Sequence, residues 1–304
     1  MEYVLTLLGN PAASPLDGDL AARTATALGS AGGQIAGPAV WLAPGIACDI
    51  AFSGLDPAAA MAAAAGAIGE RPVDYVAQER AGRRKALLLA DMDSTIIPVE
   101  CIDELADFAG LKARVAAITE RAMRGELDFP SALRERAAML RGLDESVLMR
   151  CYQERVSLNP GARALVATMR AHGAFTALVS GGFTFFTTRV RAAAGFQYDQ
   201  ANVLDVAAGK LTGRVAEPIL DAGAKFAALH RLAAERGEAL TATLAVGDGA
   251  NDLPMIKAAG LGVAYHAKPR VAQAARARID HGDLTALLYL QGYRASEITL
   301  EIPA

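Results

Sequence analysis

The chain has 304 residues, of which 53% are hydrophobic and 21% are charged, a composition that excludes a disordered polymer. Thirty Lys and Arg stand against 33 Asp and Glu, and the formal net charge of −3 argues against binding nucleic acid through a dominant basic surface. The length predicts two domains.

The cysteine pattern and the apolar runs indicate a protein of a reducing compartment. Cys48, Cys101 and Cys151 are widely spaced and form neither a disulfide framework nor a CxxC zinc pair. The first ten residues carry Glu2 and no basic residue, so they make a poor signal peptide. The apolar run over residues 58–68 is too short to span a membrane. We expect a cytoplasmic protein with no membrane partner and no nucleic-acid partner.

Residues 1–80 alternate between strand-like and helix-like patterns. The order is βαββαβ, which is typical of a ferredoxin-like module. The expected elements are a strand over 3–8, a helix over 15–28 capped by Ser14, strands over 40–42 and 47–52 around a turn at 43–45, a helix opened by Asp56-Pro57, and a strand over 73–78.

A charged segment over residues 78–85 predicts a linker, and the pattern changes after it. Continuous apolar runs at 86–90, 175–179 and 243–246 are typical of parallel strands buried on both faces. Helical patterns between them, at 161–172 and 222–235, favour an α/β domain with a parallel sheet over residues 81–304. The strand-free segment over about 102–156 predicts a helical insertion, with helices near 103–109, 111–123 and 130–140.

Each of the three apolar runs ends in a polar cluster. Because ligands bind at the carboxyl ends of parallel strands, we expect the three clusters to meet at one edge of the sheet. The clusters are Asp91-Met92-Asp93-Ser94-Thr95, Ser180-Gly181-Gly182, and Gly247-Asp248-Gly249-Ala250-Asn251-Asp252.

The residue types in these clusters predict phosphate chemistry. Four carboxylates, from Asp91, Asp93, Asp248 and Asp252, need a cation, and an all-oxygen set suits Mg²⁺. The Ser-Gly-Gly turn, expected at a helix start, presents backbone N–H groups suited to phosphate oxygens, and Lys225 can add a positive charge. Asp91 is the candidate nucleophile, and Asp93 is the candidate acid and base.

Taken one at a time, several of these residues have a simpler interpretation. Ser180-Gly181-Gly182 alone reads as an ordinary tight turn, and Lys225 alone reads as a solvated helix residue. Glu100 alone reads as an acid in the first turn of a helix, which favours the helix dipole. The convergence of the three strand ends is what favours a reactive site.

The ordered set of motifs resembles the haloacid-dehalogenase-type phosphatases, and in more detail the phosphoserine phosphatase family. The resemblance covers roughly residues 85–290 and is carried by the three clusters, Lys225, and the segments 91–106, 119–136 and 247–269. It implies a Rossmann-like three-layer core with a helical cap. Residues 1–80 resemble an ACT-like domain by element order and position.

The resemblance also implies roles in the core. Asp91 would be phosphorylated and Asp93 would be the general acid and base. Mg²⁺ would be held by the Asp91 carboxylate, the Asp93 backbone carbonyl and Asp248, with Asp252 orienting this set. Ser180, Gly181 and Lys225 would hold the phosphoryl group, with Asn251 close to the site.

The cap would set the specificity. The resemblance places Glu100 at the ammonium of the substrate and Arg136 at its carboxylate, with Met123 and Phe129 lining the closed cap. Arg136 is preferred because it follows Phe129 by seven residues, and Arg134 is the alternative.

The function implied is Mg²⁺-dependent hydrolysis of O-phospho-L-serine to L-serine and phosphate through an aspartyl-phosphate, the last step of serine biosynthesis. The alternatives are a phosphotransferase or a phosphatase acting on another small phosphomonoester, such as phosphohomoserine, and an amino-acid-binding protein with an inactive phosphatase domain. The N-terminal module would be regulatory or dimerising, with an amino-acid effector and a homodimer as its implied partners.

Overall fold

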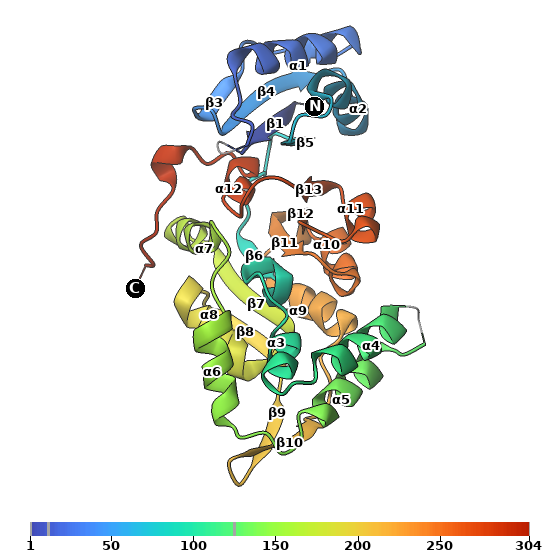
Figure 1. Ribbon diagram of the computed structural model, residues 1–304. Coiled ribbons are helices and arrows are strands. Elements are labelled where there is room, and N and C mark those ends of the chain that lie inside the picture. The colour runs from blue at the N-terminus through green and yellow to red at the C-terminus, as the bar shows by residue number, and fades with distance from the viewer. Residues whose placement is uncertain (1, 11–12, 124–125, 304) are drawn as a thin grey trace.

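The computed structural model describes residues 2–10, 13–123 and 126–303, without the side chains of Glu120, Ala122 and Met123. Figure 1 shows three regions along the molecule. They are an N-terminal sheet with two helices, a central parallel sheet, and a group of helices at the opposite end. Within the described residues no helix is both long and apolar enough to cross a membrane.

The N-terminal module has the expected βαββαβ order, with one further short strand. Its antiparallel sheet has the order β2-β4-β1-β5, and β3 also pairs with β4. Leu5, Leu7 and Ile50 of the sheet pack against Leu20 and Leu28 of the first helix. The elements are β1 (Tyr3–Gly9), α1 (Gly18–Ser30), β2 (Gln34–Ile35), β3 (Val40–Ala43), β4 (Ala47–Ser53), α2 (Pro57–Ile68) and β5 (Val73–Glu79).

The predicted start of the first helix is wrong. Ser14 is not its N-cap; α1 begins at Gly18 because the Asp17 carboxylate accepts a hydrogen bond from the Leu20 N–H, at 2.7 Å. The second helix begins as expected, since Asp56 caps it.

The core is a six-stranded sheet with the order β13-β12-β11-β6-β7-β8, in which all neighbours are parallel. The strands are β6 (Leu87–Ala90), β7 (Phe175–Phe183), β8 (Tyr198–Asn202), β11 (Thr243–Gly247), β12 (Leu261–Tyr265) and β13 (Ala277–Ile279). A separate antiparallel hairpin joins β9 (Leu204–Ala207) to β10 (Lys210–Val215).

Helices cover both faces of this sheet, so the predicted three-layer α/β class is confirmed. Leu88 of β6 points to the face covered by α7 and α8, where it shares a cluster with Leu165 and Phe186. Leu87 and Leu89 point to the other face and pack with Leu229 of α9. The helices are α7 (Ala162–Ala171), α8 (Thr184–Ala194), α9 (Ala222–Glu235), α10 (Leu253–Ala258), α11 (Pro269–Ala274) and α12 (Ala286–Leu290).

The insertion between β6 and α7 is helical, as its sequence predicts. It forms the lower group of helices in Figure 1, beside the β9–β10 hairpin. Its helices are α3 (Cys101–Phe108), α4 (Lys112–Met123), α5 (Phe129–Met139) and α6 (Ser146–Arg155). We refer to α3–α6 as the cap.

The N-terminal sheet contacts the core through the face opposite to its helices. Leu8 and Val76 share a hydrophobic cluster with Leu287 and Leu290 of α12. The buried Asp74 carboxylate accepts hydrogen bonds from the backbone N–H groups of residues 280, 281 and 282, at 2.8–3.0 Å. These contacts cover an apolar sheet face that would otherwise be exposed to water.

Candidate active site

Three neighbouring strands place the site. In the sheet, β6 lies between β11 and β7, and all three run in the same direction. Their carboxyl ends therefore lie together and bring Asp91, Ser180 and Asp248 to one edge, as the sequence predicts.

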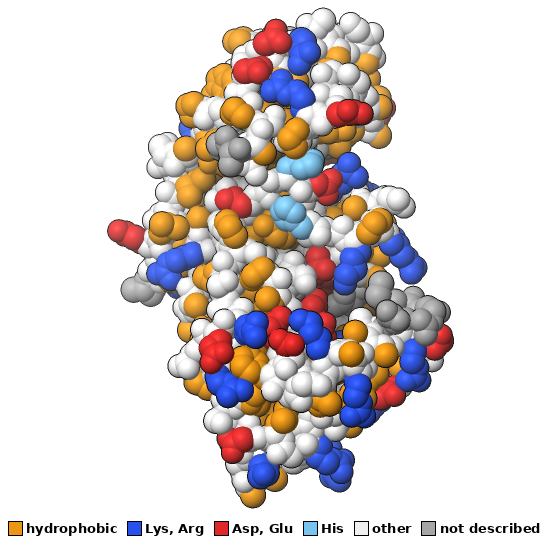
Figure 2. All heavy atoms as spheres, in the orientation of Figure 1, with side chains coloured by type: hydrophobic (Ala, Val, Ile, Leu, Met, Phe, Trp, Pro, Cys, Tyr) orange, Lys and Arg blue, Asp and Glu red, His pale blue; other side chains and the backbone are white. Residues whose placement is uncertain are grey.

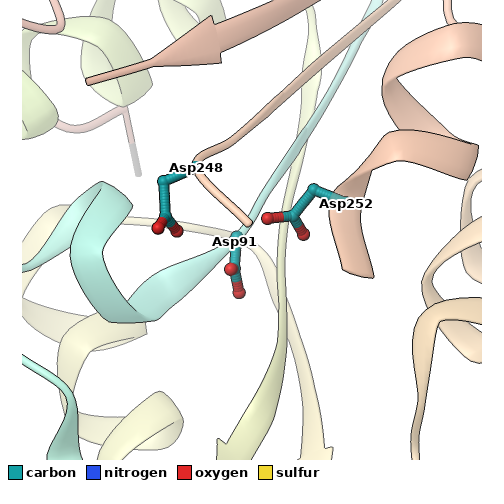
Figure 3. Close-up of side chains that lie close together, drawn as sticks. All are labelled: Asp91, Asp248 and Asp252. Atoms are coloured by element: carbon teal, nitrogen blue, oxygen red, sulfur yellow. The ribbon is translucent and has the colours of Figure 1, made fainter. Parts of the chain in front are cut away.

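Three carboxylates gather at the end of β6. Oxygen atoms of Asp91, Asp248 and Asp252 lie within 4.8 Å of one another. Figure 3 shows Asp248 and Asp252 on either side of Asp91. All three residues are buried: Asp91 is 5%, Asp248 6% and Asp252 0% exposed. Like charges so close and so buried require a cation beside them.

Lys225 supplies one positive charge to this cluster. It stands in the first turn of α9, which Asp221 caps by accepting from the Ala224 N–H. Its ammonium lies 2.6 Å from Asp91 Oδ1 and 2.7 Å from Asp252 Oδ1, and the residue is fully buried. The interpretation of Lys225 as a solvated helix residue is therefore wrong.

The ionisation of the cluster shows a shortage of positive charge. Burial and the neighbouring Asp252 raise the pKa of Asp91 despite Lys225, and the same two causes raise the pKa of Asp248 to about 6. Burial alone would lower the pKa of Lys225, but Asp252 and Asp91 raise it above its usual value. An all-oxygen set that is short of positive charge fits a hard divalent cation.

Asp252 has both of its oxygens engaged with the protein. Oδ1 contacts Lys225, and Oδ2 accepts from the Gly249 N–H at 3.0 Å. Asp248 has looser partners: the Thr95 hydroxyl at 3.4 Å and the Lys268 ammonium at 3.8 Å. Asp252 thus holds the loop and the lysine in place, and Asp248 is the freer of the two.

The Asp93 side chain lies apart from these three carboxylates. Its Oδ1 accepts from the Cys101 N–H at 3.3 Å, and a Cβ on Gly182 would lie 2.7 Å from its Oδ2. Burial, and after it the Glu100 charge, raises the pKa of Asp93 to about 7. A carboxyl group with a pKa near neutral is suited to proton transfer, and this one lies next to Gly182.

The Ser-Gly-Gly segment ends a strand and does not start a helix. Ser180, Gly181 and Gly182 belong to β7, and α8 begins only at Thr184. The pairing of β7 with β8 breaks between Val179 and Phe183, so the segment leaves the regular ladder. A Cβ at position 181 would lie 2.8 Å from the Phe129 ring, so the lack of a side chain at Gly181 lets the cap come close to this segment.

The structure separates the two candidate arginines. Arg134 is exposed and forms an ion pair with Glu217 at 2.7 Å. Arg136 is half-buried, and burial lowers its pKa against the opposing effects of Asp103, Glu100 and Asp93. Of the two, Arg136 is the one on which the charges of Asp103, Glu100 and Asp93 act.

Two further candidates lie beside these elements. Glu100 immediately precedes α3, and Asn251 lies in the short helix Ala250–Asp252, beside Gly249. The Met123 side chain lies outside the described part of the chain. Figure 2 shows acidic and basic side chains side by side over α3, between the cap and the core.

One residue of the site was not singled out from the sequence. The Ser94 hydroxyl donates to Glu100 Oε1 at 2.8 Å, and Ser94 adopts a left-handed backbone conformation with φ 55°. The sequence signal that could have identified Ser94 is its place in the polar cluster after β6, between Asp93 and Thr95. The left-handed turn is what brings the hydroxyl back to a residue six positions later.

Comparisons with known proteins agree with this geometry. A family model described as haloacid dehalogenase-like hydrolase matches residues 88–257. A phosphoserine phosphatase of Polaromonas sp. is 48% identical over 209 residues, which cover 67% of this chain and 89% of that protein. A phosphoserine phosphatase of Streptomyces coelicolor is 41% identical over 298 residues, which cover 97% of this chain and 72% of that protein.

A solved structure supports the same family over nearly the whole chain. The probable phosphoserine phosphatase from Vibrio cholerae, in an unliganded form, aligns with a TM-score of 0.77 and 32% identity, covering 97% of this chain and 88% of that one. These matches confirm the predicted family.

Proposed function

The chain belongs to the haloacid dehalogenase-like hydrolase family, and we propose that it is a phosphoserine phosphatase that hydrolyses O-phospho-L-serine to L-serine and phosphate. The observation that carries this proposal is the pairing of two groups of residues. A carboxylate–lysine cluster able to work on phosphate lies beside Glu100 and Arg136, whose opposite charges fit the two charges of an amino acid.

Two carboxylates divide the chemistry. An oxygen of Asp91 attacks phosphorus, so a bond forms between Asp91 and phosphorus while the bond from phosphorus to the serine oxygen breaks. Asp93 gives its proton to the departing serine oxygen, then takes a proton from the water that attacks the aspartyl-phosphate. Hydrolysis returns the Asp91 carboxylate and the protonated Asp93, and a pKa of about 7 lets Asp93 serve in both directions.

The phosphoryl group is held by donors at the ends of β7 and α9. Ser180 and Gly181 leave the strand ladder, and Lys225 offers an ammonium that already touches Asp91. Asn251 adds an amide from the neighbouring loop. These donors stabilise the negative charge that the phosphoryl oxygens carry during transfer.

A divalent cation fits the carboxylate cluster, and we assign it as Mg²⁺. Asp91, Asp248 and the Asp93 backbone carbonyl would hold it, with Asp252 orienting the set. When bound, such a cation neutralises the buried carboxylates and polarises the phosphoryl oxygens.

Specificity resides in the cap. Glu100, held by the Ser94 hydroxyl, meets the substrate ammonium, and Arg136 meets the substrate carboxylate in the two-pronged geometry that a guanidinium favours. Phe129 lies over Gly181 and would line the closed cap. A phosphomonoester without these charges would leave Glu100 and Arg136 without partners.

Residues 1–80 are proposed as a separate N-terminal domain of ACT-like type, and residues 81–304 as the phosphatase domain with its cap over about 102–156. The strands β1–β5 form one sheet and the strands of the parallel sheet all come later in the chain, which supports this division. An amino-acid effector at the N-terminal domain, a homodimer, a place in serine biosynthesis and a cytoplasmic location stay predictions.

The test is phosphate release from O-phospho-L-serine with and without Mg²⁺, beside phosphoethanolamine and p-nitrophenyl phosphate. We expect metal-dependent turnover that is fastest with O-phospho-L-serine. Transfer of the phosphoryl group to an added alcohol with no release of phosphate into water, or equal rates with all three substrates, would contradict the proposal.

A further inference from the structure

Asp103 carries a buried oxygen that the proposed mechanism does not use. The residue lies in the first turn of α3, three positions after Glu100. Its Oδ1 is buried and has no hydrogen-bond partner among the described residues. A buried carboxylate oxygen without a partner destabilises a fold. A functional role for Asp103 would explain why such an oxygen is present here.

The charges around Asp103 come from several parts of the cap. Burial and then Glu100 raise the pKa of Asp103, whereas Arg136 and Lys112 oppose this effect, Arg136 more strongly. In the opposite direction, Asp103 is the acidic side chain that acts most strongly on Arg136, ahead of Glu100 and Asp93. The two charges therefore act on each other across the contact between α3 and α5.

Arg136 has donors to spare. Its one hydrogen bond among the described residues runs from Nε to the Ala132 carbonyl, at 3.3 Å, which is long. A guanidinium has five N–H donors in a planar fork and can bind two carboxylates through different edges.

Glu100 is already committed elsewhere. The Ser94 hydroxyl donates to its Oε1 at 2.8 Å, which holds this carboxylate beside the loop that follows β6. Asp103, whose Oδ1 has no partner among the described residues, is the acidic residue that acts most strongly on Arg136.

We propose that Asp103 is a positioning residue for substrate specificity. When the substrate is bound, Oδ1 of Asp103 accepts a hydrogen bond from one edge of the Arg136 guanidinium. This contact orients the other edge of the guanidinium toward the substrate carboxylate. This inference rests on the proposed function, because it assigns the orientation of the group that recognises an amino-acid phosphate.

The experiment compares Asp103→Asn with wild type on two substrates. O-phospho-L-serine carries the carboxylate, and phosphoethanolamine has the same phosphate and ammonium without it. We expect kcat/KM for O-phospho-L-serine to fall about tenfold, mainly through KM, as expected for weakening one charge-assisted hydrogen bond. Turnover of phosphoethanolamine should stay within about twofold of wild type, since that substrate does not use Arg136.

Asp107→Asn is the matched control. Asp107 lies on the same helix, one turn later, and pairs with Arg155 at 3.5 Å at the surface. It loses the same charge and should leave the selectivity between the two substrates unchanged.

Thermal unfolding without substrate separates positioning from a structural role. Asp103→Asn should keep or raise the melting temperature, because it removes a buried charge without a partner. A lower melting temperature with equal loss on both substrates would overturn the inference.

A double variant gives a second, independent readout. If Asp103 acts through Arg136, adding Asp103→Asn to Arg136→Lys should cost no further selectivity. Full additivity of the two changes would overturn the inference. If wild type itself does not prefer O-phospho-L-serine to phosphoethanolamine, the proposed function fails and this inference fails with it.

Discussion

The ammonium of Lys225 lies 2.6 Å from the carboxylate of Asp91, and the protein buries both groups. The same ammonium contacts Asp252 at 2.7 Å, so a single cation bridges the candidate nucleophile and the loop after β11. This contact joins the ends of β6 and β11 to α9 in one reactive unit.

The buried contact of Lys225 predicts a large effect of its removal. Lys225→Met leaves Asp91 and Asp252 buried without their cation, a change that costs about 3–5 kcal/mol in other proteins. We expect a clear loss of unfolding free energy in denaturant, together with loss of activity. Lys257→Met, which removes an exposed lysine of α10, is the control. Equal stability of the two variants would show that the contact is dispensable.

The assignment of the nucleophile predicts a covalent phosphoenzyme. After an acid quench during turnover, the intact mass of the wild type should show one added phosphoryl group, and Asp91→Asn should show none. Asp19→Asn, at an exposed position of α1, should behave like wild type. Phosphate trapped on the Asp91→Asn protein would place the nucleophile elsewhere.

The raised pKa values predict how the stability of the metal-free protein depends on pH. The pKa values of Asp93 and Asp248 are about 7 and about 6, so between pH 4 and 7 the folded state binds more protons than the unfolded state. Stability therefore falls as pH rises through this window.

Melting temperatures in EDTA between pH 5 and 8 check this prediction. Carboxylates with lowered pKa values, such as Asp17 and Asp128, are already ionised in both states above pH 5 and do not disturb the window. Asp248→Asn should flatten the fall, and Mg²⁺ should reduce it because the cation favours the ionised carboxylates. A melting temperature that rises steadily from pH 5 to 7 in EDTA would contradict the account.

The two neighbouring arginines of α5 should differ in their effect on specificity. Arg136→Ala should raise KM for O-phospho-L-serine by about tenfold or more and change little for p-nitrophenyl phosphate. Arg134 is exposed and pairs with Glu217, so Arg134→Ala should have little effect on either substrate. Equal losses on both substrates with Arg136→Ala would exclude Arg136 as the carboxylate anchor.

The sequence predicts the central strands and their polar ends because both signals are local. The run 86–90 is wholly apolar and is followed at once by Asp91, and the apolar residues 244–246 are followed, after Gly247, by Asp248. The outer strands β8 and β13 are less visible, because Tyr198–Asn202 is largely polar and Ala277–Ile279 has three residues.

The depth of individual side chains could not be predicted in this way. Lys225 lies in the first turn of a helix, where lysine is usually solvated, and only the packing of α9 beside the strand ends buries it. Asp103 looks like another acid of a helix start, and only the packing of α5 against α3 brings the Arg136 charge close enough to act on it. Such relationships depend on contacts between elements that are distant in the sequence.

The central claim is that the cluster around Asp91 and the charged pair Glu100 and Arg136 form one site for an amino-acid phosphate. The most direct test is the ratio of kcat/KM for O-phospho-L-serine to that for p-nitrophenyl phosphate, with Mg²⁺, in wild type and Arg136→Ala. The account predicts a ratio well above one in wild type that collapses in the variant while p-nitrophenyl phosphate turnover persists. A ratio near one in wild type, or one that Arg136→Ala leaves unchanged, would contradict it.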